Sequence, residues 1–403
     1  MLDPTGALAH DEHRRLRAHG SAVQVDVLGV PAWSISDPVL LKELLTSAQV
    51  SKDARAHWPA FQETIQRWPL ALWVAVENMF TAYGADHRRL RRMVAPAFSH
   101  RRITALQKNI DALVTGLLDD LDALAPGEVV DLRDRLAYPL PIAVIGDLMG
   151  VPADQREAFR HVVDGVFDTT LTAAQSEANT AALYEALHTL IAAKRAAPGD
   201  DMTSLLITSR DEDQDSGSGM SEDELRDTLL LMISAGYETT VNVIDQAVTQ
   251  LLTHPDQLAL LRSGKADWGD AVEETLRLEP AVRHLPLRYA VTDLTLPDGQ
   301  KIAQGEAILA SYAAANRHPD WHGDSADTFD LTRPLKEHLA FGHGVHFCLG
   351  APLARMEVIT ALRLLFTRFP DLELAVEPAE LQPLGSLISN GHQTLPVRLR
   401  PTA

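Results

Sequence analysis

Apolar residues recur at three- and four-residue intervals along most of the chain, which is the spacing that one face of an α-helix requires. The pattern predicts helices over residues 7–17, 38–46, 87–98, 101–124, 140–149, 153–173, 174–196, 222–253, 257–262, 268–278 and 351–369. The helix over 222–253 is apolar through most of its length. At ~1.5 Å per residue it would be roughly 45 Å long, which is enough to cross the whole molecule.

Alternating patterns, which indicate strands, are short and lie near both ends of the chain. They predict strands over residues 23–28, 32–36, 287–291, 307–312 and 397–399. Residues 296–299 are Leu-Pro-Asp-Gly and predict a hairpin turn. Because helices fill the middle, we expect a mainly α fold with a small β region assembled from distant segments, in a single domain over residues 1–403. The acidic stretch over 211–224 is expected to be a solvated loop.

The composition limits the classes of function that the chain can have. With 403 residues, of which 46% are hydrophobic, it can bury a large core. A formal charge of −19 argues against binding to nucleic acid or to an anionic membrane, because both need a basic surface. The sequence contains no run of about 18 apolar residues to span a membrane, and its N-terminus lacks the apolar segment of a signal peptide. With a single cysteine, these features predict a cytoplasmic protein.

Cys348 is the only cysteine of the chain, so it cannot form an intramolecular disulfide. It lies in the segment Phe-Gly-His-Gly-Val-His-Phe-Cys-Leu-Gly over residues 341–350, whose glycines allow tight turns and a close approach to a flat group. A helix is predicted to begin directly afterwards, with Pro352 in its first turn. The free amides and the positive dipole end of that helix would stabilise a thiolate. A lone intracellular cysteine is more often structural, but these surroundings favour a working thiolate.

The middle of the predicted long helix carries polar residues among apolar neighbours, in the order Ala-Gly-Tyr-Glu-Thr-Thr over 235–240. Glycine and β-branched residues are poor helix formers. An acid such as Glu238 can relay protons, and the hydroxyl of Thr239 can hold water or donate a hydrogen bond. The plainer alternatives stay open, namely a threonine that bonds back to a helix carbonyl and a glutamate that is solvated or ion-paired.

Two pairs of charged residues have helical spacing. Glu274 and Arg277 lie at i,i+3 on the predicted helix over 268–278, where they form either a common surface pair or, given their apolar flanks, a buried one. His87 and Arg91 lie at i,i+4 in an arginine-rich stretch without acids, so both can reach one anionic group. Such a charge run is more often a solvated face.

These motifs together resemble those of the cytochrome P-450 superfamily. The segment over 341–350 fills every defined position of the pattern F-x-x-G-x-H-x-C-x-G. Residues 235–240 are similar to A/G-G-x-D/E-T-T/S, residues 274–277 to E-x-x-R, and residues 87–91 to H-x-x-x-R. The resemblance covers essentially the whole chain and is to the soluble bacterial, actinobacterial-like branch. It implies the cytochrome P-450 fold, a trigonal prism with haem between the long central helix and the helix after the cysteine.

The resemblance also implies roles for individual residues. Cys348 would be the proximal ligand of the iron of haem b, where an anionic thiolate favours cleavage of the O–O bond. Glu238 and Thr239 would deliver protons to bound dioxygen. Further haem-binding residues would be His87, Arg91, Arg288 and His346, which reach the propionates, together with Ala235, Gly236, Phe341, Gly342 and Gly350. A structural ion network that supports the cysteine loop would consist of Glu274, Arg277 and Arg333.

The implied activity is that of a monooxygenase which hydroxylates a lipophilic substrate with O2, with a steroid, a macrolide or another polycyclic natural product as the first expectation. Electrons from NAD(P)H would arrive through a separate ferredoxin and ferredoxin reductase, because the sequence contains no flavin-binding stretch and no ferredoxin-type cysteine cluster. An acidic ferredoxin would be attracted by a basic island of Arg88, Arg89, Arg92, Arg101, Arg102 and Arg355. We expect a monomer.

The positions that match the family's substrate pocket suggest a mainly apolar cavity. They are Val76, Met79, Phe80, Leu231, Ala235, Val282, Leu285 and Ile388, and each could equally be ordinary core. Two other functions stay open. A peroxide-driven haem oxygenase is disfavoured by the acid and alcohol pair, since peroxide already brings protons and electrons. A haem-thiolate sensor or lipophile carrier is disfavoured because the motifs leave no segment large enough for an output domain.

Overall fold

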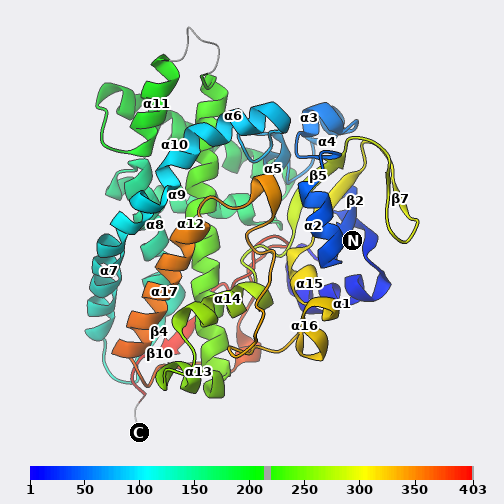
Figure 1. The fold of residues 1–403 in the computed structure, drawn as a ribbon. Coiled ribbons are helices and arrows are strands. Elements are labelled where there is room, and N and C mark those ends of the chain that lie inside the picture. Colours follow the sequence, from blue (N-terminus) through cyan, green and yellow to red (C-terminus); the bar gives the residue numbers. More distant parts are fainter. Residues whose placement is uncertain (213–218, 402–403) are drawn as a thin grey trace.

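The computed structural model describes residues 1–212 and 219–401. It is mainly helical, and the strands near the N-terminus form a small β region at one side of the molecule (Figure 1). The predicted loop over 211–224 includes residues 213–218, which lie outside the described residues.

The α-helices of the described parts are α1 (Ala9–His19), α2 (Pro38–Thr46), α3 (Ala54–His57), α4 (Phe61–Thr64), α5 (Leu72–Ala75), α6 (Gly84–Val94), α7 (His100–Asp122), α8 (Pro139–Met149), α9 (Arg156–Phe167), α10 (Ala173–Ala196), α11 (Met202–Glu212), α12 (Glu222–Thr253), α13 (Pro255–Arg262), α14 (Trp268–Leu278), α15 (Tyr312–Asn316), α16 (Pro319–His322) and α17 (Ala351–Arg368).

The central element is α12, which begins and ends at the residues that the sequence predicts. Ser221 and Glu224 form a capping box that satisfies the first amides of the helix. Most of its side chains are buried, and it packs against α8, α14 and α17. Figure 1 shows α12 running through the middle of the molecule, with α7 to α10 on one side and the main sheet on the other. Polar residues on such a helix must therefore find partners inside the protein.

Five strands that are far apart in the sequence form the main sheet. Its order is β1 (Ala22–Val27), β2 (Val30–Ile35), β8 (Ala307–Ala310), β5 (Leu285–Ala290) and β3 (Val50–Ser51), with β2 and β8 parallel and the other neighbours antiparallel. A second sheet pairs β10 (Pro396–Arg398) with β4 (Val129–Asp131) and β9 (Glu373–Leu374). The hairpin predicted at 296–299 joins β6 (Leu294–Thr295) to β7 (Lys301–Ile302), and Gly299 has the positive φ of 87° that its turn requires. The predicted mainly α fold with a small β region is thus confirmed.

The predicted helix over 153–173 is wrong in its last part. It ends at Phe167, and the chain then takes an extended conformation. The hydroxyl of Thr169 accepts a hydrogen bond from the amide of Leu387 at 2.9 Å and donates one to the carbonyl of Pro4 at 2.6 Å. These contacts with both ends of the chain outweigh the local helix propensity.

The start of the next helix agrees with the predicted 174–196 to within one residue, because a capping box of Thr172 and Gln175 begins α10 at Ala173. The helix predicted over 87–98 starts earlier, at Gly84, and continues after Val94 as a 3₁₀ turn that contains Pro96. The helix α11 was not predicted.

The hydrophobic core extends through the helical part of the molecule and reaches the main sheet. Buried apolar residues of α7, α8, α12, α14 and α17 belong to one continuous cluster, which includes residues of β2, β5 and β8. Within residues 1–212 and 219–401, we find no helix that has both the length and the apolar character needed to cross a membrane.

Candidate active site

A cavity lies between the middle of α12 and the loop that contains Cys348. It encloses about 1370 Å³ of empty space, part of which is open to solvent. The apolar part of its lining comes mainly from α12, the segment after α14, the cysteine loop with the start of α17, and the segment before α6. Predicted haem-site residues from distant parts of the sequence meet in this cavity, namely Arg91, Ala235, Gly236, Thr239, Arg288, Phe341, Gly342, His346, Cys348 and Gly350.

The loop around Cys348 is held by its own backbone. The amide of Cys348 donates a hydrogen bond to the carbonyl of Phe341 at 2.9 Å. Gly342 and Gly344 have φ values of 70° and 72°, a region that favours glycine. A Cβ at position 344 would lie 2.8 Å from the carbonyl oxygen of Leu45, so the contact between this loop and α2 also requires glycine. The backbone therefore fixes where the cysteine side chain points.

The thiol of Cys348 is exposed to the cavity, although protein atoms surround it on the other sides. Burial raises its pKa, while hydrogen bonds from the amides of Gly350 and Ala351 and the positive charges of Arg91 and Arg355 act in the opposite direction. The two amides belong to the start of α17, where the helix dipole favours negative charge. A bound metal ion would remove the remaining cost of ionisation, because its charge deprotonates a coordinating thiol.

The cavity side of α12 presents Ala235 and Thr239. The hydroxyl of Thr239 donates a hydrogen bond to the carbonyl of Ala235 at 2.9 Å, which is the back-bonded arrangement that the sequence left open. Gly236 also borders the cavity, but a Cβ there would lie 2.6 Å from the Cδ1 atom of Ile145 on α8. The glycine therefore allows α8 to pack closely against α12, in addition to leaving space in the cavity.

Glu238 is buried and does not line the cavity. Its Oε1 accepts a hydrogen bond from Asn242 at 3.0 Å and lies 4.0 Å from Arg133, while its Oε2 has no hydrogen-bond partner among the described residues. Burial raises the pKa of Glu238 from 4.5 to about 7; the charge of Arg133 acts against this rise and that of Asp164 adds to it. The carboxyl group can therefore gain or lose a proton near neutral pH, next in sequence to the hydroxyl of Thr239.

A buried polar network behind Glu238 was not identified from the sequence. Arg133 is completely buried and donates hydrogen bonds to Asp245 at 2.7 Å and to Asn242 at 2.8 Å. The other oxygen of Asp245 contacts the ring of His392 at 2.7 Å, and the side chain of His392 is 15% exposed. The signals in the sequence were an acid inside an apolar helix and an arginine directly after a leucine, but neither signal indicates that the two residues meet.

Cationic and imidazole side chains gather at one edge of the cavity. The rings of His87 and His346 are 4.2 Å apart, and Arg91 donates a hydrogen bond to the carbonyl of Phe347 at 2.7 Å. Burial, with smaller effects of neighbouring cations, lowers the pKa of His87 to about 4 and lowers that of His346 further. Nε2 of His87 and Nε of Arg288 are buried without a hydrogen-bond partner among the described residues.

This arrangement fits the haem that the resemblance implies. Buried donors without partners are costly unless an anion or another acceptor reaches them. A haem carries two carboxylates at one edge and a metal at its centre, which suits a cationic edge, a glycine-rich loop and a thiol in one cavity. His87 does not line the cavity itself and contacts it through His346.

Glu274, Arg277 and Arg333 are buried together on the side of α14. Arg277 donates two hydrogen bonds of 2.8 Å to the two carboxylate oxygens of Glu274, and Arg333 donates one of 3.2 Å. The remaining donors of Arg277 reach the carbonyls of Ala326 at 2.7 Å and Thr328 at 2.9 Å. The sequence suggested either a surface pair or a buried pair, and the structure has the buried one.

A chain of hydrogen bonds connects this ion network to the cysteine loop. Arg277 also approaches the carbonyl of Asn316 at 3.4 Å. The side chain of Asn316 accepts a hydrogen bond from the amide of Leu339 at 2.7 Å, and the carbonyl of Leu339 accepts one from Gly342 at 2.8 Å. Movement of the ion network would therefore be transmitted to the loop that carries Cys348.

The predicted substrate-pocket residues divide into two groups. Two do not line the cavity, which corrects the expectation. Val76 is 6% exposed, and its carbonyl is held by the hydroxyl of Thr81 at 2.5 Å; Ile388 is completely buried in the hydrophobic core. Those that line the cavity are Met79, Phe80, Leu231, Ala235, Val282 and Leu285.

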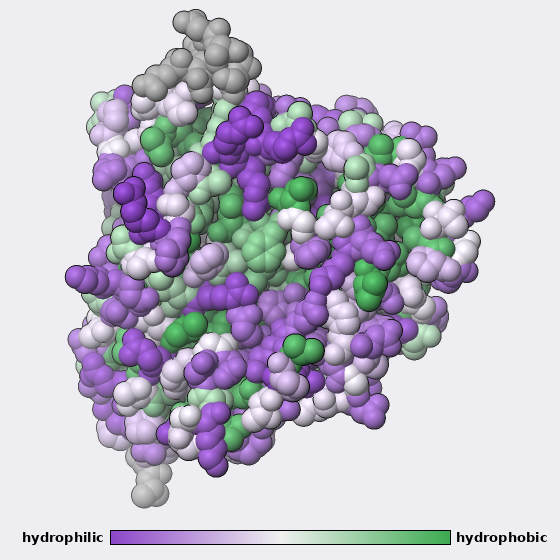
Figure 2. All heavy atoms as spheres, in the orientation of Figure 1, coloured by the Kyte–Doolittle hydropathy of each residue, from purple (hydrophilic) through white to green (hydrophobic). Residues whose placement is uncertain are grey.

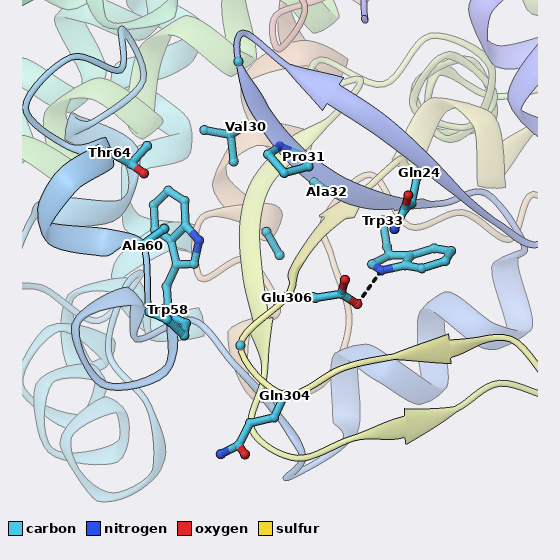
Figure 3. Close-up of a pocket in the computed structure, with 14 residues that line it drawn as sticks. Gln24, Val30, Pro31, Ala32, Trp33, Trp58, Ala60, Thr64, Gln304 and Glu306 are labelled. Carbon is cyan, nitrogen blue, oxygen red and sulfur yellow. Dashed lines mark hydrogen bonds between the residues drawn. The ribbon is translucent and has the colours of Figure 1, made fainter.

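A second hollow lies at the edge of the main sheet (Figure 3). It is bounded by β2, by the segment around Trp58 and by the turn before β8, and no predicted site residue lines it. Figure 3 shows the carboxylate of Glu306 beside Trp33, whose Nε1 donates a hydrogen bond to it at 2.9 Å. The hollow has no thiol and no cluster of buried cations, so its chemistry differs from that of the Cys348 cavity.

Comparisons with known proteins agree with the motifs, the fold and the cavity. A family model described as "Cytochrome P450" matches residues 140–263 and 270–388. The chain is 42% identical to 2-hydroxy-5-methyl-1-naphthoate 7-hydroxylase of Streptomyces carzinostaticus over 100% of this chain and 98% of that protein, and 35% identical to vitamin D(3) 25-hydroxylase of Pseudonocardia autotrophica over 97% and 94%. The structure of CYP154A1 from Streptomyces coelicolor A3(2) is similar with a TM-score of 0.96, at 72% identity over 99% of each chain. The protein therefore belongs to the cytochrome P450 family of monooxygenases, in its bacterial branch.

Proposed function

We propose that the protein hydroxylates a lipophilic polycyclic compound with O2, using electrons from NAD(P)H that a ferredoxin and its reductase deliver. The observation that carries the proposal is the cavity in which the thiol of Cys348, the hydroxyl of Thr239 and a cationic edge meet. We also propose that the protein acts as a cytoplasmic monomer with one domain over residues 1–403.

In this proposal, bound haem supplies the metal centre at which dioxygen is activated. Cys348 would ligate the metal. The hydroxyl of Thr239, which here bonds to Ala235, can rotate and donate a hydrogen bond into the cavity. Glu238 would supply the proton by turning its unpaired oxygen towards Thr239. The haem carboxylates would be held by His87, Arg91, Arg288 and His346.

The apolar lining supports a lipophilic substrate. Met79, Phe80 and Leu285 provide large apolar side chains to the cavity wall. The names of two similar proteins state that they hydroxylate a naphthoate and vitamin D(3). A steroid, a macrolide or another polycyclic natural product is the substrate class that we propose.

The proposed docking surface for ferredoxin is smaller than the sequence suggested. Arg89 forms an ion pair with Glu224, and Arg355 forms one with Glu273, so both of these charges are neutralised. Figure 2 shows hydrophilic side chains gathered over α6, above a hollow with hydrophobic side chains. The other four of these six arginines are exposed and form no ion pair with a described residue, namely Arg88, Arg92, Arg101 and Arg102, and from here on the basic island means these four.

The test is the spectrum of the reduced holoprotein with carbon monoxide. A thiolate ligand predicts a strongly red-shifted Soret band in the wild type. Cys348→Ala should lose this band, and its haem content, measured separately, shows whether haem is still bound. Folded wild-type holoprotein without the shifted band, or Cys348→Ala with it, would contradict the proposal.

A further inference from the structure

Lys52 lines the cavity, and the proposed function gives it no role. It follows β3 and is only 2% exposed. Its Nζ donates a hydrogen bond to the carbonyl of Pro286 at 3.3 Å and lies 3.5 Å from the centre of the Phe80 ring. Among the described residues it has no acidic partner, whereas buried lysines are rare unless they are paired.

Lys52 lies in an environment that disfavours its charged form. Burial of the amine, with a smaller effect of the charge of Arg288, lowers the pKa of Lys52 well below its ordinary value. Among the described residues, no Asp or Glu forms an ion pair with Lys52, Arg91 or Arg288, the three cations at this edge.

The cations at this edge of the cavity outnumber the anionic groups that haem would bring. The two haem carboxylates would be balanced by the two guanidinium groups at this edge, those of Arg91 and Arg288. A charged Lys52 would then be a surplus cation inside an apolar cavity, which is costly without a further anion. A carboxylate within hydrogen-bond distance would restore the balance and form a charge-assisted hydrogen bond.

We propose that Lys52 binds a carboxylate group of the substrate, so that the preferred substrates are lipophilic carboxylic acids. This inference rests on the proposed function, because it needs a substrate in the haem-containing cavity. The ring of Phe80 covers one side of the ammonium group, and both residues line the cavity. A ligand that joins a carboxylate to an apolar ring system matches this combination of one cation and an apolar wall. A haem carboxylate has the same chemistry and is the competing source.

The test compares matched ligands on the ferric holoprotein. A panel of acids and their primary amides, beginning with 1-naphthoate and 1-naphthamide and extending to steroid acids, is titrated while the displacement of the iron-bound water is followed in the Soret band. In Lys52→Met the ratio of the acid Kd to the amide Kd should rise about ten- to hundred-fold, since a hydrogen bond to a charged group is lost. Lys52→Arg should retain most of the preference. The matched control is Lys301→Met, which changes an exposed lysine on β7 and should leave the ratio unchanged.

A second measurement separates the two sources of the carboxylate. The rate of haem transfer from each variant to apomyoglobin should be the same for Lys52→Met and Lys301→Met if Lys52 serves the substrate. Faster transfer from Lys52→Met with an unchanged ratio would assign Lys52 to a haem carboxylate and overturn the substrate assignment. If neither quantity changes, the residue binds no carboxylate.

The wild type alone also tests the inference, in case Lys52→Met does not fold. If amides shift the Soret band of the wild type while none of the matched acids does, the inference is overturned. Failure of the proposed function is distinguishable from either result, because it would appear as a wild-type holoprotein without the shifted carbon monoxide band.

Discussion

The carboxyl group of Glu238 is buried near the guanidinium group of Arg133, but the two groups are too far apart for a hydrogen bond. Because burial raises the pKa of Glu238 from 4.5 to about 7, the protonated and ionised forms of this side chain exchange near neutral pH. We expect the infrared difference between wild type and Glu238→Gln to contain a protonated-carboxyl band that disappears with a midpoint of about pH 7. Because the residue interacts with Arg133 and Asp164, the midpoint belongs to the coupled group.

The same shift predicts the pH dependence of stability. The folded-state pKa lies above the unfolded value, so the protonated carboxyl favours folding, and this contribution is fully present below about pH 4.5 and lost as the pH rises through about 7. Urea unfolding at pH 5 and at pH 8 should therefore show wild type losing stability relative to Glu238→Gln as the pH rises. A carboxyl band that disappears near pH 4.5, or an unchanged stability difference, would show that Glu238 is not held in this environment.

The hydroxyl of Thr239 should matter for proton delivery and little for folding. In Thr239→Ala we expect normal haem content and ligand binding, while product formed per NAD(P)H consumed falls at least several-fold, because positioned proton donors contribute about 10²–10⁴ to rate. The matched control is Thr249→Ala, on the same helix but outside the cavity. Equal coupling in wild type and Thr239→Ala would mean that another group delivers the proton.

The residues that could be predicted from the sequence are those whose spacing is local. The thiol of Cys348, the pair Glu238 and Thr239 and the pair Glu274 and Arg277 are each recognisable within ten residues of sequence. The charged partner of Glu238 could not be predicted, because Arg133 comes from a segment about a hundred residues away. Lys52 gave no signal either, since a lysine between a serine and an aspartate is ordinary on a surface.

Among the elements, those with strong periodicity and local caps matched their predictions most closely. The bounds of α12 and α14 agree because each begins with a capping box that can be found in the sequence. The end of α9 was predicted too far along the chain, because Thr169 is held by Pro4 and Leu387, which only the folded chain brings near. Helix ends that tertiary contacts impose are invisible to periodicity.

The helix α14 depends on the geometry of one guanidinium group. Arg277 makes a two-pronged contact with Glu274 and also donates to backbone carbonyls of the segment 316–328. Lysine cannot reproduce this fork, so Arg277→Lys should lower the free energy of unfolding by about 3 kcal/mol or more, measured by urea unfolding. Haem should also be lost more readily, because the same hydrogen bonds lead to the cysteine loop.

Arg195→Lys is the matched control for this variant. Arg195 forms an ion pair with Glu222 at the surface, with 39% of its side chain exposed, and the change should alter the free energy of unfolding by at most about 0.5 kcal/mol. A similar small effect of Arg277→Lys would mean that the buried network contributes little to the stability of α14.

For the whole molecule, we expect the distribution of surface charge to affect association with a ferredoxin more than the net charge does. The chain has a net charge of −19, yet none of the four arginines of the basic island, Arg88, Arg92, Arg101 and Arg102, forms an ion pair with a described residue. An acidic ferredoxin would be repelled by most of the surface and attracted to this region. The electrostatic field of the protein would therefore determine the orientation in which the ferredoxin binds, as well as favouring an acidic partner. The predicted consequence is a rate of reduction that falls as salt is added, because the Debye length shrinks to ~10 Å at 0.1 M ionic strength.

Charge reversal tests this orientation directly. Arg101→Glu combined with Arg102→Glu should lower the rate of reduction by an acidic ferredoxin about ten-fold at low ionic strength, and the difference should shrink at high salt, where screening removes the attraction. The matched control, Arg14→Glu combined with Arg15→Glu, changes the net charge equally at exposed positions of α1. If the two double variants slow reduction to the same extent, only the total charge matters. If only the double variant at Arg101 and Arg102 slows reduction, the ferredoxin must approach the face that carries α6 and the start of α7.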